Sequence, residues 1–107
     1  MPEEFGVAFV TAPNRDEAEK IANALVEEKL AACCSLVPSI RSIYRWKGEI
    51  CRDEEVLMII KTRRALFEKL RARVKELHSY EVPEIILLPI VAGHAPYLDW
   101  LRDETQP

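Results

Sequence analysis

Residues 33–61 read CCSLVPSIRSIYRWKGEICRDEEVLMIIK, and this stretch decides the fold. Both halves, 33–46 and 49–61, are rich in residues that favour β-strands, and only Lys47-Gly48 lies between them as a turn. We therefore predict one long β-hairpin. At about 3.3 Å per residue its first arm would reach roughly 45 Å, whereas a usual strand spans about 17–20 Å. A domain of this size cannot cover such an arm.

A two-residue loop at Lys47-Gly48 fixes how the two arms pair. Pro38 lies near the middle of the first arm, and because proline cannot donate to a β-ladder, we predict an edge strand or a bulge there. Residues 56–60 are apolar at every position, so the inner half of the second arm belongs to a core. The predicted cross-strand pairs are Trp46 with Glu49, Tyr44 with Cys51, Ile43 with Arg52, and Arg41 with Glu54.

The segment before the hairpin predicts a strand followed by a helix. Residues 5–11 are apolar on both faces, as in a central strand. Asn14 followed by Glu17 has the N-cap and N3 spacing of a capping box, which indicates where the helix begins. Apolar residues at three- and four-residue steps then extend this helix to about Leu30.

The segment after the hairpin predicts a second helix, a last strand and a short terminal helix. Apolar residues recur with helical spacing over 64–77. Residues 84–91 form an apolar strand, in which Pro89 favours an edge position and the unbroken hydrophobic run favours cover on both faces. Residues 97–101 suit a terminal helix with Pro96 in its first turn.

This order of elements predicts an α+β fold, the ferredoxin-like βαββαβ sandwich. Numbered along the chain, the antiparallel strands would lie in the order 4-1-3-2. That order places the strands that contain Pro38 and Pro89 at the two edges, where proline is tolerated. The 107 residues suit a single domain, 1–107, with one hydrophobic core.

The outer half of the hairpin predicts assembly with further copies. It would expose apolar and aromatic side chains together with unpaired backbone groups, and such an edge favours pairing with another chain. Because the two sheet edges are different surfaces, the contact would be heterologous and should close into a ring. The side chains that would be exposed are Ile40, Ile43, Tyr44, Trp46 and Ile50.

Composition narrows the functional classes. A formal net charge of -3, with basic and acidic residues spread along the chain, argues against nucleic-acid binding. No segment approaches the roughly 18 apolar residues of a membrane span, and residues 1–4 lack the pattern of a signal peptide, so we expect a cytoplasmic protein with no membrane association. Three cysteines without CxxC spacing indicate reduced thiols. Without GxSxG, HExxH, P-loop or GxGxxG motifs, we expect neither an enzyme nor an organic cofactor.

Five short motifs follow one another along nearly the whole chain. They are LAAC at 30–33, SIYRWKGEI at 42–50, IKT at 60–62, HSYEVPEI at 78–85 and YLDWL at 97–101. Together they resemble the CutA family of divalent-cation tolerance proteins. The resemblance implies a ferredoxin-like homotrimer whose long strands pair between subunits. It also implies a role in tolerance of heavy metals, especially copper, through metal binding, and brings no family-wide catalytic reaction.

Two positions depart from the family pattern. Ser79 stands where the family usually has proline, and losing that ring leaves the loop less restricted. Cys34 lies beside Cys33, where the family commonly has one cysteine, and alternation along a strand predicts that the two side chains point to opposite faces.

Cys33 and His78 are the predicted metal ligands, with Glu81 as a carboxylate partner and Glu84 as a further carboxylate near His78. Thiolate and imidazole suit copper and zinc, provided that the two side chains approach each other within the fold or across subunits. Cys33 could instead be a small buried hydrophobe. His78 could instead interact with the last carbonyls of the preceding helix.

A second set of residues could line a ligand-binding cleft between subunits. Aromatic residues are also common at interfaces simply because they pack well, so this alternative stays open. The set comprises Trp46, Glu49, Lys61, Tyr80, Glu84, Tyr97 and Trp100.

Two functions follow from these residues. The first is a metal-ion-binding homotrimer that contributes to divalent-cation tolerance, with copper or another divalent ion as its ligand. The second is a trimeric signalling or scaffold module that binds a small ligand or a partner protein at its intersubunit clefts.

Overall fold

The computed structural model describes residues 3–106, so Met1, Pro2 and Pro107 of the predicted 1–107 domain lie outside the described residues. The chain forms a four-stranded antiparallel sheet in the order β2-β3-β1-β4, which confirms the predicted topology. Its elements are β1 (Phe5–Ala12), α1 (Arg15–Glu27), β2 (Cys33–Trp46), β3 (Glu49–Arg63), the 3-10 turn η1 (Arg64–Leu66), α2 (Phe67–Leu77), β4 (Ile85–Pro89) and α3 (Ala95–Glu104).

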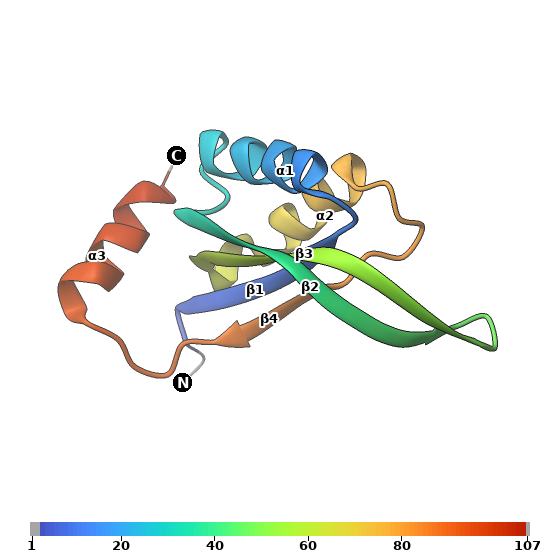
Figure 1. Cartoon of the computed structure of the whole chain (residues 1–107). Helices are drawn as coiled ribbons and strands as arrows, with labels where there is room; N and C mark the ends of the chain where they lie inside the picture. Colours follow the sequence, from blue (N-terminus) through green and yellow to red (C-terminus); the bar gives the residue numbers. More distant parts are fainter. Residues whose placement is uncertain (1–2, 107) are drawn as a thin grey trace.

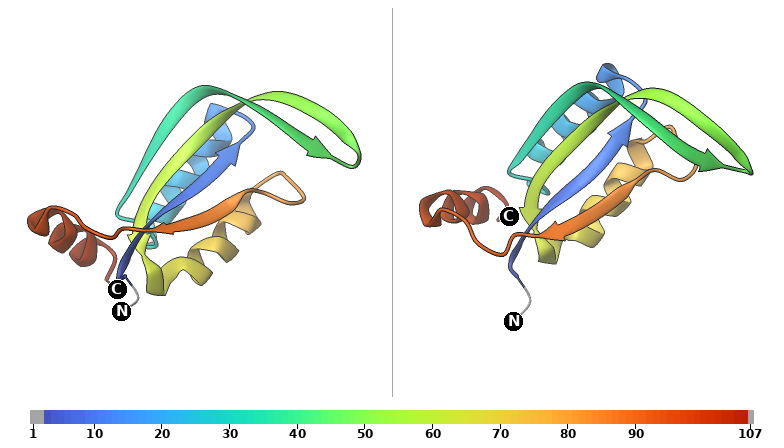
Figure 2. Two further views of the ribbon diagram at one scale, coloured as in Figure 1. Left: turned by 90° about the horizontal axis from the view of Figure 1, so that it is seen from below. Right: turned by 60° about the horizontal axis from the view of Figure 1, so that its bottom comes forward.

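Helices α1 and α2 cover one face of the sheet, and α3 packs at the end of the sheet where β1 begins (Figure 1). The main core lies between these helices and the inward-facing residues of β1 and β3. Its largest fully buried side chains include Val10, Ile21, Leu25, Met58, Ile60, Leu70 and Val74. The opposite face of the sheet carries no helix, as the views in Figure 2 show.

The predicted boundaries hold where a local signal exists. The Asn14 side chain accepts a hydrogen bond from the Glu17 backbone N–H at 2.9 Å and begins α1. The helix ends at Glu27 rather than near Leu30, because Lys29 adopts a left-handed conformation with φ of 61°. The second predicted helix begins with the 3-10 turn η1, so α2 itself is shorter than 64–77.

The hairpin has the predicted register throughout. Lys47 and Gly48 have φ angles of 50° and 82°, as a two-residue hairpin turn requires, and Trp46 lies opposite Glu49. A bulge between Val37 and Ile40 interrupts β2 at Pro38, as predicted. The remaining predicted pairs are also present: Tyr44 with Cys51, Ile43 with Arg52, and Arg41 with Glu54.

The hairpin divides into two halves. We call residues 33–37 and 56–63 the inner half, since β3 there also pairs with β1. We call residues 40–55 the outer half, which projects beyond the rest of the sheet (Figures 1 and 2). Ile43 in the outer half is 64% exposed, whereas Ile60 in the inner half is fully buried.

Strand β4 is covered on one face only, so the prediction of cover on both faces is wrong for the single chain. Ile86 and Leu88 point to the helix-free face and are 48% and 43% exposed. Leu87 points to the core and approaches Gly6 of β1 so closely that a Cβ at that position would lie 2.6 Å from Leu87 Cδ1. Glycine at position 6 therefore permits the central and edge strands to pack together.

Candidate functional site

The predicted metal ligands lie at opposite ends of the sheet. Cys33 pairs with Lys61, which in turn pairs with Val7 near the start of β1. The His78 ring instead contacts the carbonyl of Thr11, near the end of β1. At about 3.3 Å per residue, the two positions are roughly 13 Å apart along the strand. Cys33 and His78 therefore do not meet within one chain.

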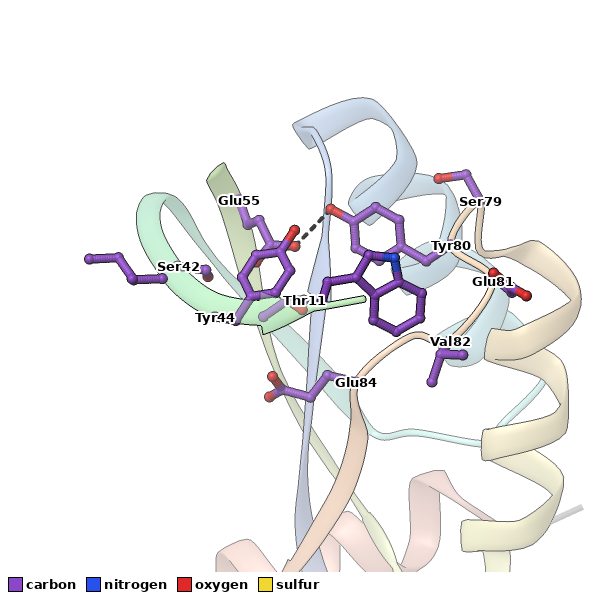
Figure 3. Close-up of a pocket in the computed structure, with 11 residues that line it drawn as sticks. Thr11, Ser42, Tyr44, Glu55, Ser79, Tyr80, Glu81, Val82 and Glu84 are labelled. Atoms are coloured by element: carbon purple, nitrogen blue, oxygen red, sulfur yellow. Dashed lines mark hydrogen bonds between the residues drawn. The ribbon is translucent and has the colours of Figure 1, made fainter. Parts of the chain in front are cut away.

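A pocket of about 680 Å³ lies at the end of the sheet where β1 ends (Figure 3). Its walls come from β1, from the outer half of the hairpin and from the connector between α2 and β4. Segments that are distant in the sequence thus converge on one space. The lining residues are Thr11, Ser42, Ile43, Tyr44, Trp46, Glu55, Ser79, Tyr80, Glu81, Val82 and Glu84.

Two tyrosines of this pocket donate hydrogen bonds to carboxylates. Tyr80 Oη donates to Glu55 Oε2 over 2.7 Å, the bond dashed in Figure 3. The Tyr44 hydroxyl donates to Asp53, and that bond raises the pKa of Tyr44 to about 12. Burial, followed by the bond to Glu55, raises the pKa of Tyr80. Both phenols are therefore neutral donors at pH 7, and these bonds hold their rings in place.

Carboxylates give the pocket its charge. Glu55 is only 6% exposed although it lines the pocket. Removal from water, followed by the negative charge of Glu55, raises the pKa of Glu84. The lining residues, all within the described range 3–106, include no Lys or Arg. The interior of the pocket is therefore acidic.

His78 is a buried positioning residue in the single chain. Its Nε2–H donates to the Thr11 carbonyl over 2.7 Å, and its Nδ1 accepts from the Tyr80 backbone N–H at 3.1 Å. Its ring also stacks at a tilt on Tyr80, with centroids 4.7 Å apart. Since it contacts the end of β1 rather than the last carbonyls of α2, the alternative drawn from the sequence is wrong. Both ring nitrogens are occupied, so metal binding would require one of these bonds to break.

Ser79 replaces the conformational restriction of proline with hydrogen bonds. Its backbone N–H and its hydroxyl both donate to Glu17 Oε2, each over 3.0 Å. Proline at this position could make neither bond, because it lacks both donors. The Glu17 side chain therefore ties the pocket connector to α1 rather than closing the predicted capping box. The two residues are 62 positions apart, and no local pattern could have paired them.

Cys33 lies in a polar cluster at the other end of the sheet. Its Sγ is 3.9 Å from Lys61 Nζ and 3.8 Å from the Ser35 hydroxyl, to which Lys61 also donates at 3.1 Å. Cys34 points to the opposite face and packs against the core, as predicted, and burial raises its pKa to about 12. Cys33 is half-buried, so its thiol is the more accessible of the two.

Helix α3 adds aromatic residues near this cluster. Burial, followed by the charge of Cys33, raises the pKa of Tyr97. The Tyr97 and Trp100 rings pack at a centroid distance of 5.4 Å.

Among residues 3–106, no group of three or more His, Cys, Asp or Glu side chains is close enough to hold a metal ion within one chain. No helix of that range is long and apolar enough to cross a membrane.

Comparison with known proteins places this geometry in a family. Residues 6–104 match the family model described as CutA1 divalent ion tolerance protein. The chain belongs to the CutA family. The chain is 54% identical to the divalent-cation tolerance protein CutA of Thermus thermophilus over 92% of its own length and 96% of the relative. It is 50% identical to the human protein CutA over 99% of its own length and 59% of the relative.

Solved structures agree with the CutA assignment. The crystal structure of CutA1 from the psychrotrophic bacterium Shewanella sp. SIB1 superposes with a TM-score of 0.95 at 41% identity, and the match covers 100% of both chains. The family is named for tolerance of divalent ions and not for a reaction.

In this CutA-family chain the predicted cleft residues divide between the two ends of the sheet. Trp46, Tyr80 and Glu84 line the pocket, together with the predicted metal ligand Glu81. The others lie elsewhere: Glu49 opposite Trp46 at the hairpin tip, Lys61 beside Cys33, and Tyr97 and Trp100 on α3.

The sequence prediction missed Tyr44 and Glu55 as pocket residues. The hairpin register contained the signal for Tyr44. It shares a face with Trp46, and it lies opposite Cys51, so it is diagonal to Asp53. Glu55 could not be found in this way, because its partner Tyr80 comes from a connector that only the tertiary fold brings near.

Proposed function

We propose that this chain contributes to divalent-cation tolerance by binding the metal ion itself, as a cytoplasmic homotrimer that catalyses no reaction. The observation that carries the proposal is the position of Cys33, a half-buried thiol outside the main core, beside Ser35 and Lys61. Thiolate is a preferred ligand of copper and zinc, and a cytoplasmic location keeps thiols reduced.

The proposed site forms between subunits. Within one chain Cys33 is too far from the other predicted ligands, so it would combine with His78 and Glu81 of the partner subunit. A heterologous contact suits this arrangement, because it brings different ends of two copies together. His78 would release one of its two hydrogen bonds to bind the ion. Leaving a buried group unpaired costs about 1–3 kcal/mol, so Cys33 should contribute more to affinity than His78.

Exposed apolar surface supports the trimer. Ile43 and Ile50 in the outer half of the hairpin are 64% and 47% exposed, and Ile86 and Leu88 add apolar surface on β4. Strands β2 and β4 each have one unpaired edge. Such edges favour addition of a strand from another chain. The family resemblance supplies the number three. Light scattering after size-exclusion chromatography should therefore give three times the chain mass of 12.3 kDa, and a monomer at micromolar concentration would refute the assembly.

Zinc calorimetry on the intact oligomer tests the metal site, since Zn²⁺ has no redox chemistry to complicate the measurement. Cys33→Ala should weaken binding at least about tenfold, as expected for the loss of a ligand worth more than 1.4 kcal/mol. Cys51→Ala is the matched control, because Cys51 is also half-buried but lies in the outer half of the hairpin. Unchanged affinity in both Cys33→Ala and His78→Ala would exclude this site.

The alternative function, a trimeric module that binds a small ligand, gains support from one observation. The pocket that contains Glu55 and Tyr80 involves neither Cys33 nor His78 in its lining. A thermal-shift screen separates the two functions, because only a compound that binds the folded state raises Tm. Stabilisation by metal ions alone supports the first function, and stabilisation by a metabolite supports the second.

A further inference from the structure

The acidic pocket beside β1 has walls that suit a particular class of ligand. Its volume of about 680 Å³ falls within the range of small-molecule sites, which is about 300–1,000 Å³. Three aromatic side chains line it: Tyr44, Trp46 and Tyr80. Tyr44 and Trp46 are 40% and 41% exposed, so much of their ring surface remains free of packing within the chain.

The charge around these rings selects for a cation. Glu55, Glu81 and Glu84 line the same pocket, and none of its lining residues in the described chain is basic. In the view of Figure 3, Glu55 lies at the upper end of the Tyr44 ring and overlaps it, and Glu84 lies below. Glu55 is buried, and removal from water, followed by the charge of Glu55, raises the pKa of Glu84, so the two carboxylates lie close together in a partly dehydrated pocket. An anionic ligand would be repelled, and a cation would relieve the repulsion.

The aromatic walls favour an organic cation over a metal ion. In residues 3–106 the carboxylates do not converge into a group that could hold a metal. Aromatic faces offer no lone pairs to a small, strongly hydrated ion, whereas they attract a large cation through the negative charge of the ring face. Ammonium groups that carry alkyl substituents combine a positive charge with apolar surface, and both match this lining.

Trp46 already attracts a cation within the chain. The Lys47 Nζ atom lies 5.6 Å from the centre of the Trp46 ring, inside the range of about 6 Å for cation–π contacts. Lys47 lies at the hairpin turn and is not one of the pocket-lining residues. The indole face can thus hold a cation, and a ligand ammonium on that face would take the place of Lys47.

We propose that this pocket binds a small alkylated ammonium ion. Its alkyl groups contact the faces of Tyr44, Trp46 and Tyr80, and Glu55 and Glu84 supply the opposing charge. Tyr80 keeps Glu55 in place through its hydroxyl, so the ring and the carboxylate are presented together. The inference rests on the second function proposed above and names the class of its ligand; of the predicted metal ligands, only Glu81 also lines this pocket.

Titration with tetramethylammonium, followed by calorimetry on the intact oligomer, tests this proposal. The neutral analogue tert-butanol is the matched probe, since it has a similar branched shape without the charge. We expect saturable binding of tetramethylammonium and at least about tenfold weaker binding of tert-butanol, because cation–π attraction requires the charge.

Variants locate the binding. Trp46→Leu should weaken binding about fivefold or more, and Trp100→Leu should not, although both tryptophans are 41% exposed. Glu84→Gln should also weaken binding and avoids the risk that replacing buried Glu55 unfolds the chain. Equal binding of tert-butanol, or unchanged binding in both Trp46→Leu and Glu84→Gln, would overturn the proposal. Zinc calorimetry with Cys33→Ala is independent of either result, because Cys33 does not line this pocket.

Discussion

The two halves of the β2-β3 hairpin are joined by continuous strands, yet they are stabilised differently. The inner half contributes Met58 and Ile60, which are fully buried against α1 and α2. The outer half pairs only with itself and leaves Ile43 and Ile50 exposed. Within the chain, the outer half is held in its conformation by the hydrogen bonds of the β-ladder, by the two-residue turn and by cross-strand contacts such as that of Tyr44 with Asp53.

The outer half therefore contributes little to the hydrophobic core of its own chain. Exposed aromatic and aliphatic surface costs solubility and is retained where a partner or ligand uses it. In this chain the outer half supplies Tyr44 and Trp46 to the pocket and a free edge to a neighbouring copy. The inner half stabilises the fold, and the outer half is available for recognition.

The largest expected effect compares two isoleucines of the hairpin. Ile60→Ala should lower the free energy of unfolding by about 2–5 kcal/mol, because it leaves a cavity in the core. Ile43→Ala should cost less than about 1 kcal/mol, because most of that side chain is exposed in the chain. Urea unfolding of both variants at one protein concentration measures the difference.

Concentration dependence sharpens this comparison. A cost of Ile43→Ala that rises with protein concentration would show that a second copy covers the outer half. Equal costs for both variants at every concentration would contradict the division into a stabilising half and a recognition half.

The next effect concerns the wall of the pocket that faces the outer half. Glu17→Gln should destabilise the fold by about 1–2 kcal/mol, because hydrogen bonds to a charged acceptor are stronger than those to a neutral one. The Ser79 backbone and hydroxyl would lose that charged acceptor. Glu19→Gln, an exposed change on the same helix, is the control in thermal unfolding. A cost no larger than that of the control would mean that Ser79 does not hold the connector.

A smaller effect is expected at the tip of the outer half. Gly48→Ala should cost about 1 kcal/mol, because φ of 82° is unfavourable for a residue with a Cβ. No atom lies within 4 Å of an added Cβ, so the cost would come from the backbone alone. Gly48→Asn is the matched variant and should recover part of the loss, since asparagine tolerates this conformation. Thermal melting followed by circular dichroism measures the Tm of both variants.

The smallest effect depends on pH and concerns the acidic pocket. The pKa of Glu84 in the fold lies above its ordinary value of 4.5, so its protonated form is favoured there. The stabilisation that protonated Glu84 gives the fold is fully present below the pKa of Glu84 in the unfolded chain. It is lost as the pH rises through the higher pKa of Glu84 in the fold. Glu84→Gln should therefore raise Tm by about 1–2 °C at pH 7, with solvent screening keeping the effect small. The gain should vanish near pH 4. An equal gain at both pH values would contradict burial as its cause, and Glu49→Gln at the exposed tip is the control.

The fold could be predicted from the sequence because its decisive signals are local. Lys47-Gly48 sets the register, Asn14 begins α1, and the two strand prolines mark the sheet edges. Errors arose where the backbone decides without a side-chain signal, as at Lys29, where the chain turns left-handed and ends α1 early. The two-sided cover expected for β4 also failed, because an apolar strand at a free edge has the same composition as a buried one.

The candidate site could be predicted only in part. Trp46, Tyr80 and Glu84 were found and do line one pocket, but Lys61, Tyr97 and Trp100 lie far from it in the chain. Composition shows which residue types can take part in recognition. It cannot show which end of a sheet each one occupies, since that depends on strand pairing over tens of residues.

The bulge at Pro38 and Ser39 also bears on how copies of this chain can be added to one another. A straight edge of fourteen residues would be a template for open-ended fibre growth. Ser39, with φ of 62°, leaves the ladder unpaired at that point and bends the strand. The two segments of β2 on either side of the bulge therefore point in different directions. A copy that pairs with one segment cannot continue in a straight line along the other. Straightening the edge, for instance by deleting one of residues 38 and 39, should replace this limited assembly with insoluble aggregation.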